Sequence, residues 1–303
     1  MHNQTVTSPI LFLLFNRVEC TRRVFAAISE AKPTKLYVAI DGPRINNSTD
    51  IENVAAVQKL VLDHIDWPCE IKTLIRDKNL GCREAVSSAI SWFFEHEEEG
   101  IILEDDCLPN HSFFVFCDTL LSRYRFDERI RHISGVNFLD TVLPGSDSYY
   151  FSKFTHVWGW ASWRRVWKDY DKEMKLLDQV VKEKRLYNVY PDRSIVNSLV
   201  KNFQYVKDGK MDTWDFQYLF LNFISNGLCI IPVRSMIQNI GFGLGSTHVH
   251  PDNLQLSETA EMIEMIHPVF FIPQIQYDLA SFIKINNFSL KNKIKLRLTS
   301  IFQ

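Results

Sequence analysis

The chain has 303 residues, of which 46% are hydrophobic, 13% aromatic and 23% charged, and its formal net charge is -2 at pH 7. A chain of this length can bury roughly three quarters of the surface that its unfolded form exposes, which is enough for a substantial core. The near-zero charge provides no positive field of the kind that attracts nucleic acid, so we expect no nucleic-acid partner. The longest apolar runs, ILFLLF and LFLNFIS, fall short of the ~18 residues that a membrane span needs.

The six cysteines are scattered, without a CxxC pair or the spacing of a zinc finger. The first residues, MHNQTVTSPILF, lack the basic start and the long apolar stretch of a signal peptide. We therefore expect free thiols and a cytoplasmic location.

Apolar runs alternate with helical patterns over the first 135 residues. The runs at 10–15, 35–40, 70–75 and 100–103 are strand-like, and their continuous apolar character indicates strands covered on both faces. Helical periodicity lies between them, and Thr21 is the expected N-cap of the first helix. This order predicts an α/β fold with a Rossmann-type, mostly parallel sheet flanked by helices, in which ligands bind beyond the carboxyl ends of the strands.

Each of the four predicted strands ends in polar or charged residues. These are Asn16 and Arg17, then Asp41, Gly42 and Arg44, then Arg76, Asp77 and Asn79, and finally Glu104, Asp105 and Asp106. Two like charges about 4 Å apart repel by roughly 4 kcal/mol at an effective dielectric of 20, so the acidic triplet favours a bound Mn2+ or Mg2+, which prefer oxygen ligands. A solvated strand end or a helix N-cap is the alternative for the triplet.

The second half is expected to complete the sheet and to build the far wall of the site. The predicted elements are a helix over 112–124, a strand near 132–138, a loop entering a helix over 156–167, charged helical segments to about 206, an apolar helix within 213–227, a strand over 228–233 and a glycine-rich segment over 240–250. We expect one continuous body over 1–280 and a basic amphipathic tail over 281–303. That tail could lie on an anionic membrane surface, or dock as a solvated helix.

Several short motifs together resemble a bacterial family of nucleotide-diphospho-sugar transferases over roughly residues 8–250. They are FNR (15–17), IDGPR (40–44), RDKNLGC (76–82), EEGIILEDDC (98–107), WGWASWRRVW (158–167) and TWDFQ (213–217). This family is distantly similar to the eukaryotic α-mannoside β-1,2-N-acetylglucosaminyltransferase, which also carries an EDD triplet and a later WD motif. The resemblance implies a GT-A-like fold with a nucleotide-binding half over about 8–135 and an acceptor half over about 136–280.

The resemblance also implies an activity. It is the metal-dependent, inverting transfer of a hexosyl or N-acetylhexosaminyl group from a nucleoside diphosphate donor, with UDP as the nucleotide. The acceptor would be a saccharide, free or lipid-linked, in the synthesis of a bacterial surface glycan, with the enzyme in the cytoplasm or peripheral on the inner face of the membrane.

Roles for the residues at the predicted sheet edge follow from the same resemblance. Asp106 would bind the metal, Glu104 and Asp105 would face the ribose or the donor sugar, Asp41 would contact the nucleoside, Arg17 the base or diphosphate, and Asn79, Gly81 and Arg83 the nucleotide side.

Asp215 is the candidate base that removes the acceptor proton, by its match to the WD motif and because a carboxylate commonly does this work. It could instead cap the helix that follows, and Asp212 competes for either role. His248 is a candidate second metal ligand, among Gly241, Gly243 and Gly245, with His250 as the weaker choice and a structural or solvent-exposed histidine as the alternative.

Trp158, Trp160 and Trp214 are candidate acceptor-stacking residues, with core packing as the alternative for each.

Two rival functions remain open. A sugar nucleotidyltransferase normally has a glycine-rich basic loop after its first strand, whereas FNRVECTRR contains no glycine. A non-catalytic carbohydrate-binding protein on a GT-A scaffold is disfavoured by the presence of both the EDD and the WD motifs.

Overall fold

The first half of the chain folds as the alternation of apolar runs predicts. The computed structural model describes residues 6–139, 145–241 and 259–286. Its first elements are β1 (Ile10–Leu14), α1 (Val18–Ala31), β2 (Lys35–Ile40), α2 (Ser48–Leu62), β3 (Glu70–Ile75), α3 (Gly81–His96) and β4 (Glu99–Glu104). All four strands lie in one sheet and pair in parallel in the order β3-β2-β1-β4.

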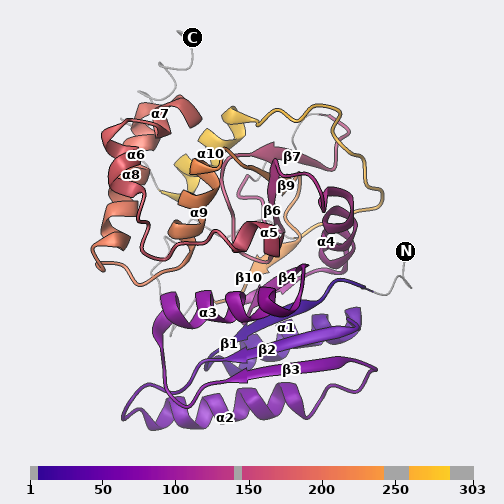
Figure 1. The fold of residues 1–303 in the computed structure, drawn as a ribbon. Helices are drawn as coiled ribbons and strands as arrows, with labels where there is room; N and C mark the ends of the chain where they lie inside the picture. The colour runs from indigo at the N-terminus through magenta and orange to yellow at the C-terminus, as the bar shows by residue number, and fades with distance from the viewer. Residues whose placement is uncertain (1–5, 140–144, 242–258, 287–303) are drawn as a thin grey trace.

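The second half extends the same sheet. Its elements are β5 (Cys107–Pro109), α4 (His111–Tyr124), β6 (Ile130–Ser134), β7 (Tyr149–Ser152), β8 (Trp160–Trp163), α5 (Arg164–Trp167), α6 (Leu177–Lys182), α7 (Leu186–Val189), α8 (Arg193–Lys207), α9 (Asp215–Ile224), β9 (Leu228–Pro232), β10 (Ile237–Asn239) and α10 (Ile275–Ile285). The sheet has eight strands in the order β3-β2-β1-β4-β8-β6-β9-β7, and four of its seven pairings are parallel. The predicted mostly parallel sheet flanked by helices is therefore confirmed (Figure 1).

The two halves occupy different parts of the molecule although they share the sheet. Figure 1 shows β1, β2 and β3 with α1 and α2 in its lower part, and α6, α7 and α8 gathered beside α9 in its upper part. β5 follows β4 directly in the chain, and it pairs antiparallel with β10 in a small second sheet. Because β5 follows the acidic triplet, this pair fixes the chain just beyond it.

Three local predictions are wrong. Thr21 is not an N-cap: α1 begins at Val18 after Arg17, and Thr21 lies fully buried in the first turns, with its backbone N–H donating to the Arg17 carbonyl at 2.9 Å. The strand at 70–75 is not covered on both faces, because β3 is the edge strand and its side chains are exposed or half-buried. Residues 160–163 are not a loop but strand β8, which inserts antiparallel between β4 and β6.

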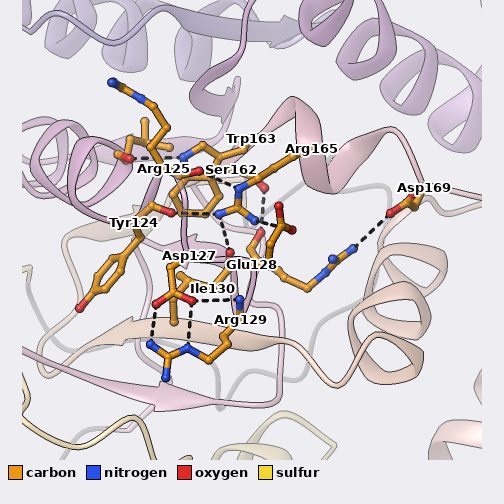
Figure 2. A network of polar contacts seen from close by, with 12 residues as sticks. Tyr124, Arg125, Asp127, Glu128, Arg129, Ile130, Ser162, Trp163, Arg165 and Asp169 are labelled. Carbon is orange, nitrogen blue, oxygen red and sulfur yellow. Dashed lines mark hydrogen bonds and ion pairs between the residues drawn. The ribbon is translucent and has the colours of Figure 1, made fainter.

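Arg165 holds the start of α5 in place, at the end of the sheet where β6 begins. Figure 2 shows Arg165 reaching the connection between α4 and β6, where its guanidinium donates to the carbonyls of Arg125 at 2.9 Å, Tyr124 at 3.0 Å and Ile130 at 2.8 Å. Ile130 begins β6, which runs in the same direction as β4 because both are antiparallel to β8. This network therefore lies at the edge opposite the acidic triplet and stabilises the fold.

No helix in the described parts of the chain is long and apolar enough to cross a membrane. The predicted basic tail lies mostly outside the described residues, with only its start, up to Ile285, in α10.

Candidate functional site

The acidic triplet lies at the carboxyl end of β4, as predicted, and faces a cation supplied by the neighbouring strand. Glu104 is the last residue of β4 and is aligned with Leu13 of β1, so the turn that carries Asp105 and Asp106 lies beside Arg17, which follows β1. The Arg17 Nη1 atom is 2.6 Å from Asp106 Oδ2 and 3.3 Å from Asp105 Oδ1. Arg17 thus offsets the like-charge repulsion that the sequence implies.

Burial and neighbouring carboxylates raise the pKa values of two acids of the triplet. Burial raises the pKa of Glu104, and the charges of Asp106, Asp105 and Asp215 raise it further. Burial and then Asp106 also raise the pKa of Asp105, while Arg17 opposes both rises. A second positive charge at this position would therefore be bound favourably by the ionised acids.

Asp41 and Asn79 come together, but they bind each other and the backbone. Asp41 accepts hydrogen bonds from the Asn79 side-chain amide at 2.8 Å, from the Gly42 N–H at 3.0 Å and from the Leu80 N–H at 3.1 Å. Only 7% of Asp41 is exposed. Asp41 therefore ties the end of β2 to the start of α3, a role that the sequence analysis missed.

The start of α3 is capped by a residue more than a hundred positions away. Asp212 accepts hydrogen bonds from the backbone N–H groups of Cys82 at 2.9 Å and Arg83 at 3.1 Å. Gly81 has a φ of +79°, and a Cβ there would lie 2.8 Å from Asp212 Oδ2, so glycine is required for this approach. A carboxylate at a helix N-terminus is a familiar preference, but the sequence gives no sign that this one serves a distant helix.

Asp215 belongs to the second half of the chain and follows the Asp212 that caps α3 by three residues. It is the first residue of α9, it is half-buried, and the Thr213 hydroxyl donates a hydrogen bond to its Oδ1. Its charge contributes to the raised pKa of Glu104, which places the two carboxylates within electrostatic range. Trp214, and not Asp215, occupies the N-cap position.

A groove lies along the outer face of α3. It has a volume of about 640 Å³ and lies between α3 and residues 170–175, with Trp92 and Tyr170 among its aromatic lining and Ser87, Ser88 and Ser91 among its hydroxyls. The Tyr170 hydroxyl donates to the Trp214 carbonyl at 3.0 Å, so Tyr170 connects the groove to the residue that precedes Asp215. Burial raises the pKa of this hydroxyl, and the charge of Asp215 adds to the rise. Tyr170 is not among the residues predicted from the sequence.

The predicted tryptophan wall is mostly core. Trp160 has 0% exposure and Trp214 has 3%, and their rings stack on each other with centroids 5.6 Å apart. A ring without exposed surface cannot stack on an acceptor sugar, so core packing, the alternative named above, is what the structure shows for both. Trp158 is half-buried and packs edge-on to Phe138 at 4.9 Å, so it stays a candidate.

His248, His250, Gly243 and Gly245 lie outside the described residues. Gly241 is described, and its backbone passes so close to Asp106 that an added Cβ would lie 2.3 Å from Asp106 Oδ2. The neighbouring Ile240 N–H donates to the Asp106 carbonyl at 2.8 Å. The end of β10 therefore packs directly against the proposed metal ligand.

The residues fit a divalent cation in their chemistry. Among the described residues, no three His, Cys, Asp or Glu side chains are arranged as a preformed metal site. Carboxylate oxygens are nevertheless the ligands that Mg2+ and Mn2+ prefer, and the best-placed one, Asp106 Oδ2, already accepts from a cationic group. Within the described ranges, Asp106 and its neighbours in the triplet have the chemistry to hold such an ion.

Comparison with known proteins finds no matching family model and no matching curated protein. Several solved structures are similar in part. A mannosyltransferase from Pyrobaculum calidifontis in complex with GDP-Man and Mn2+ is 11% identical over 54% of this chain and 46% of its own, with a TM-score of 0.35. Mouse xyloside xylosyltransferase 1 is 10% identical over 71% and 80%, with a TM-score of 0.33. A UDP-glucose pyrophosphorylase in complex with UDP-glucose is 9% identical over 54% and 71%, with a TM-score of 0.30. The match thus spans less than half of the mannosyltransferase.

Proposed function

We propose that this protein is a divalent-cation-dependent glycosyltransferase that moves a hexosyl or N-acetylhexosaminyl group from a nucleoside diphosphate donor, a UDP-sugar, to a saccharide acceptor. The observation that carries the proposal is the acidic triplet at the carboxyl end of β4, paired with Arg17 and in electrostatic range of Asp215. In this proposal the triplet would bind a cation, Arg17 would bind an anion and Asp215 would take a proton.

Each group has a distinct task in this proposal. Asp106 would hold Mn2+ or Mg2+, with His248 as the second candidate ligand, and the ion would act as a Lewis acid toward the departing diphosphate. Glu104 and Asp105 would face the ribose or the donor sugar. Arg17 would pair with the diphosphate, because a guanidinium matches phosphate oxygens.

The nucleoside end of the donor would lie over the start of α3. Asp41 and Asn79 shape this surface through their mutual hydrogen bond, and Gly81 and Arg83 complete it. Since both Asp41 oxygens already accept hydrogen bonds within the protein, we propose that Asp41 acts here mainly by holding the loop in place.

Asp215 would take the proton from the attacking hydroxyl, which implies inversion by direct displacement. The Thr213 hydroxyl binds its Oδ1, so Oδ2 is the atom that would receive the proton. The groove beside Tyr170 offers aromatic rings and hydroxyls to an acceptor that is itself a saccharide, and Trp158 could add a further stacking surface. A lipid-linked acceptor of a bacterial surface glycan and a peripheral position on the inner membrane face complete the proposal.

The test is a panel of UDP-, GDP- and dTDP-sugars followed by thermal shift with and without Mn2+, and then by nucleotide release. We expect one donor to raise Tm only when Mn2+ is present and to release its nucleoside diphosphate slowly. A rise without any metal effect, or no rise with any donor, would contradict the proposal. Formation of a nucleotide sugar and pyrophosphate from a nucleoside triphosphate and a sugar 1-phosphate would instead identify a nucleotidyltransferase.

The base is tested by Asp215→Asn in single-turnover transfer, with Asp212→Asn as the matched control. General-base catalysis commonly contributes about 10²- to 10⁴-fold, so transfer should slow by at least about a hundredfold in Asp215→Asn while donor affinity is kept. Asp212→Asn should keep most of its rate, because its amide oxygen can still accept from one of the two N–H groups that Asp212 binds at the start of α3. The opposite pattern would transfer the role to Asp212.

A further inference from the structure

Arg17 occupies the position that the acidic triplet otherwise offers to a metal ion. Its Nη1 atom alone contacts two acids, at 2.6 Å from Asp106 Oδ2 and 3.3 Å from Asp105 Oδ1. The pair is well shielded, since the side chains of Asp105 and Asp106 are 9% and 15% exposed and that of Arg17 is 25% exposed. A single positive atom between two carboxylates is the arrangement that a bound cation would also make.

The triplet needs a positive charge whether or not a ligand is bound. Asp105 and Asp106 are neighbours in the turn, both are largely buried, and the Arg17 guanidinium is the cationic group that contacts them. A buried carboxylate that loses its cationic partner is strongly destabilised. A metal ion that displaced Arg17 would therefore replace its charge at the acids, and the guanidinium would need a new anion.

The backbone of Arg17 is fixed, so an exchange would involve only its side chain. Arg17 is the N-cap of α1, and its carbonyl accepts the Thr21 N–H at 2.9 Å. On the other side of the triplet, the Asp106 carbonyl accepts the Ile240 N–H at 2.8 Å. The long, flexible arginine side chain can thus swing by a few ångströms while the acids stay in place.

We propose that Arg17 holds the cation position of the triplet in the ligand-free protein and is exchanged for a divalent cation when a nucleoside diphosphate binds. The diphosphate supplies the anion that the released guanidinium needs, because arginine binds phosphate oxygens in a bidentate manner. The cation alone must compete with Arg17 and binds weakly, whereas cation and diphosphate together bind tightly. Linkage requires each ligand to raise the affinity of the other by the same factor. This inference rests on the proposed function, of which it describes the regulation.

The experiment measures Mn2+ affinity of the full chain, from the electron paramagnetic resonance signal of free Mn2+, with and without UDP. In wild type, UDP should tighten Mn2+ binding at least about tenfold. In Arg17→Gln, Mn2+ should bind about tenfold more tightly than in wild type without UDP, a change equivalent to about 1.4 kcal/mol, and UDP should add little. An affinity in Arg17→Gln equal to or below that of wild type would overturn the exchange.

Three further variants make the result specific. Arg17→Lys keeps the charge and should bind Mn2+ within a few-fold of wild type, so an increase as large as that of Arg17→Gln would overturn a charge-based exchange. Arg23→Gln removes the same charge from an exposed position on α1 and should leave Mn2+ affinity unchanged. Adding Asp106→Asn to Arg17→Gln should abolish the tight Mn2+ binding, and its persistence would overturn the assignment of the ion to the triplet.

Failure of the proposed function has a different signature. If wild type binds Mn2+ and UDP cooperatively but Arg17→Gln gains nothing, the exchange is wrong and the function stands. If no variant binds Mn2+ with or without UDP, the metal-dependent transferase itself is wrong. A thermal melt of each variant checks that it is folded, so that a loss of Mn2+ binding cannot result from unfolding.

Discussion

Replacing Asp41 by alanine is expected to lower the free energy of unfolding by about 3 kcal/mol. The variant loses three hydrogen bonds, from the Asn79 amide at 2.8 Å, the Gly42 N–H at 3.0 Å and the Leu80 N–H at 3.1 Å. Bonds to a charged acceptor contribute roughly 1.5 kcal/mol or more each, but the carboxylate is buried and burial raises its pKa, so its desolvation offsets part of the sum. For a chain of this size the loss corresponds to a fall in Tm of about 5 °C.

The assay is urea unfolding at neutral pH, followed by tryptophan fluorescence. Asp41→Asn keeps an acceptor oxygen and the side-chain volume, so it should lose about half as much stability. Asp63→Ala, at the exposed C-cap position of α2, is the control and should change stability by less than about 0.5 kcal/mol. A stability of Asp41→Ala equal to that of the control, together with a loss of UDP affinity, would refute the structural role and make Asp41 a ligand contact.

Substitutions at three further places test separate features of the core. Thr21 is fully buried and its Oγ1 has no hydrogen-bond partner among the described residues, so Thr21→Val should raise stability by about 1 kcal/mol; Thr21→Ser, which keeps the hydroxyl, should not. Burial raises the pKa of Asp278 to about 7, so the native state retains this proton while the unfolded chain loses it near pH 4, and stability should fall as pH rises from about 4 to 7. Asp278→Asn should flatten that part of the pH profile of urea unfolding, and an unchanged slope would show that another group causes it. Trp160→Ala should cost about 4 kcal/mol and Trp158→Ala clearly less, because only Trp160 is fully buried; equal losses in Tm would contradict this difference.

The sequence predicts those parts of the fold in which a residue pattern is compatible with one stable structure. The runs at 10–15 and 35–40 are apolar enough to require burial on both faces, and they form the buried strands β1 and β2. The order of strands and helices then places Arg17 and the acidic triplet at the same sheet edge, and their ion pair follows from that proximity.

The parts that the sequence does not predict depend on contacts between distant residues. Trp160 lies in a four-residue strand that is recognisable only once β4 and β6 are present on either side of it. The capping role of Asp212 depends on the packing of the second half against α3. Glu70 and Lys72 interrupt the apolar run at 70–75, and this was a usable sign that β3 is not covered on both faces.

The polar side chains at the site fall into two groups that differ in how easily a ligand could replace their partners. Asp41 is bound by backbone N–H groups and by Asn79, and those donors cannot leave unless the start of α3 moves. Asp105 and Asp106 share one cationic partner, the end of the long Arg17 side chain, while their further partners, the Phe15 N–H for Asp105 and the Cys107 thiol for Asp106, carry no charge. The Arg17 side chain can leave while its backbone stays. A cation can therefore replace Arg17 at the ends of β1 and β4 without moving the backbone. Replacing the partners of Asp41 at β2 and α3 would require the start of α3 to move. A donor that carries its charge in one part would place its diphosphate and cation over the former, and its uncharged nucleoside over the rigid surface that Asp41 maintains.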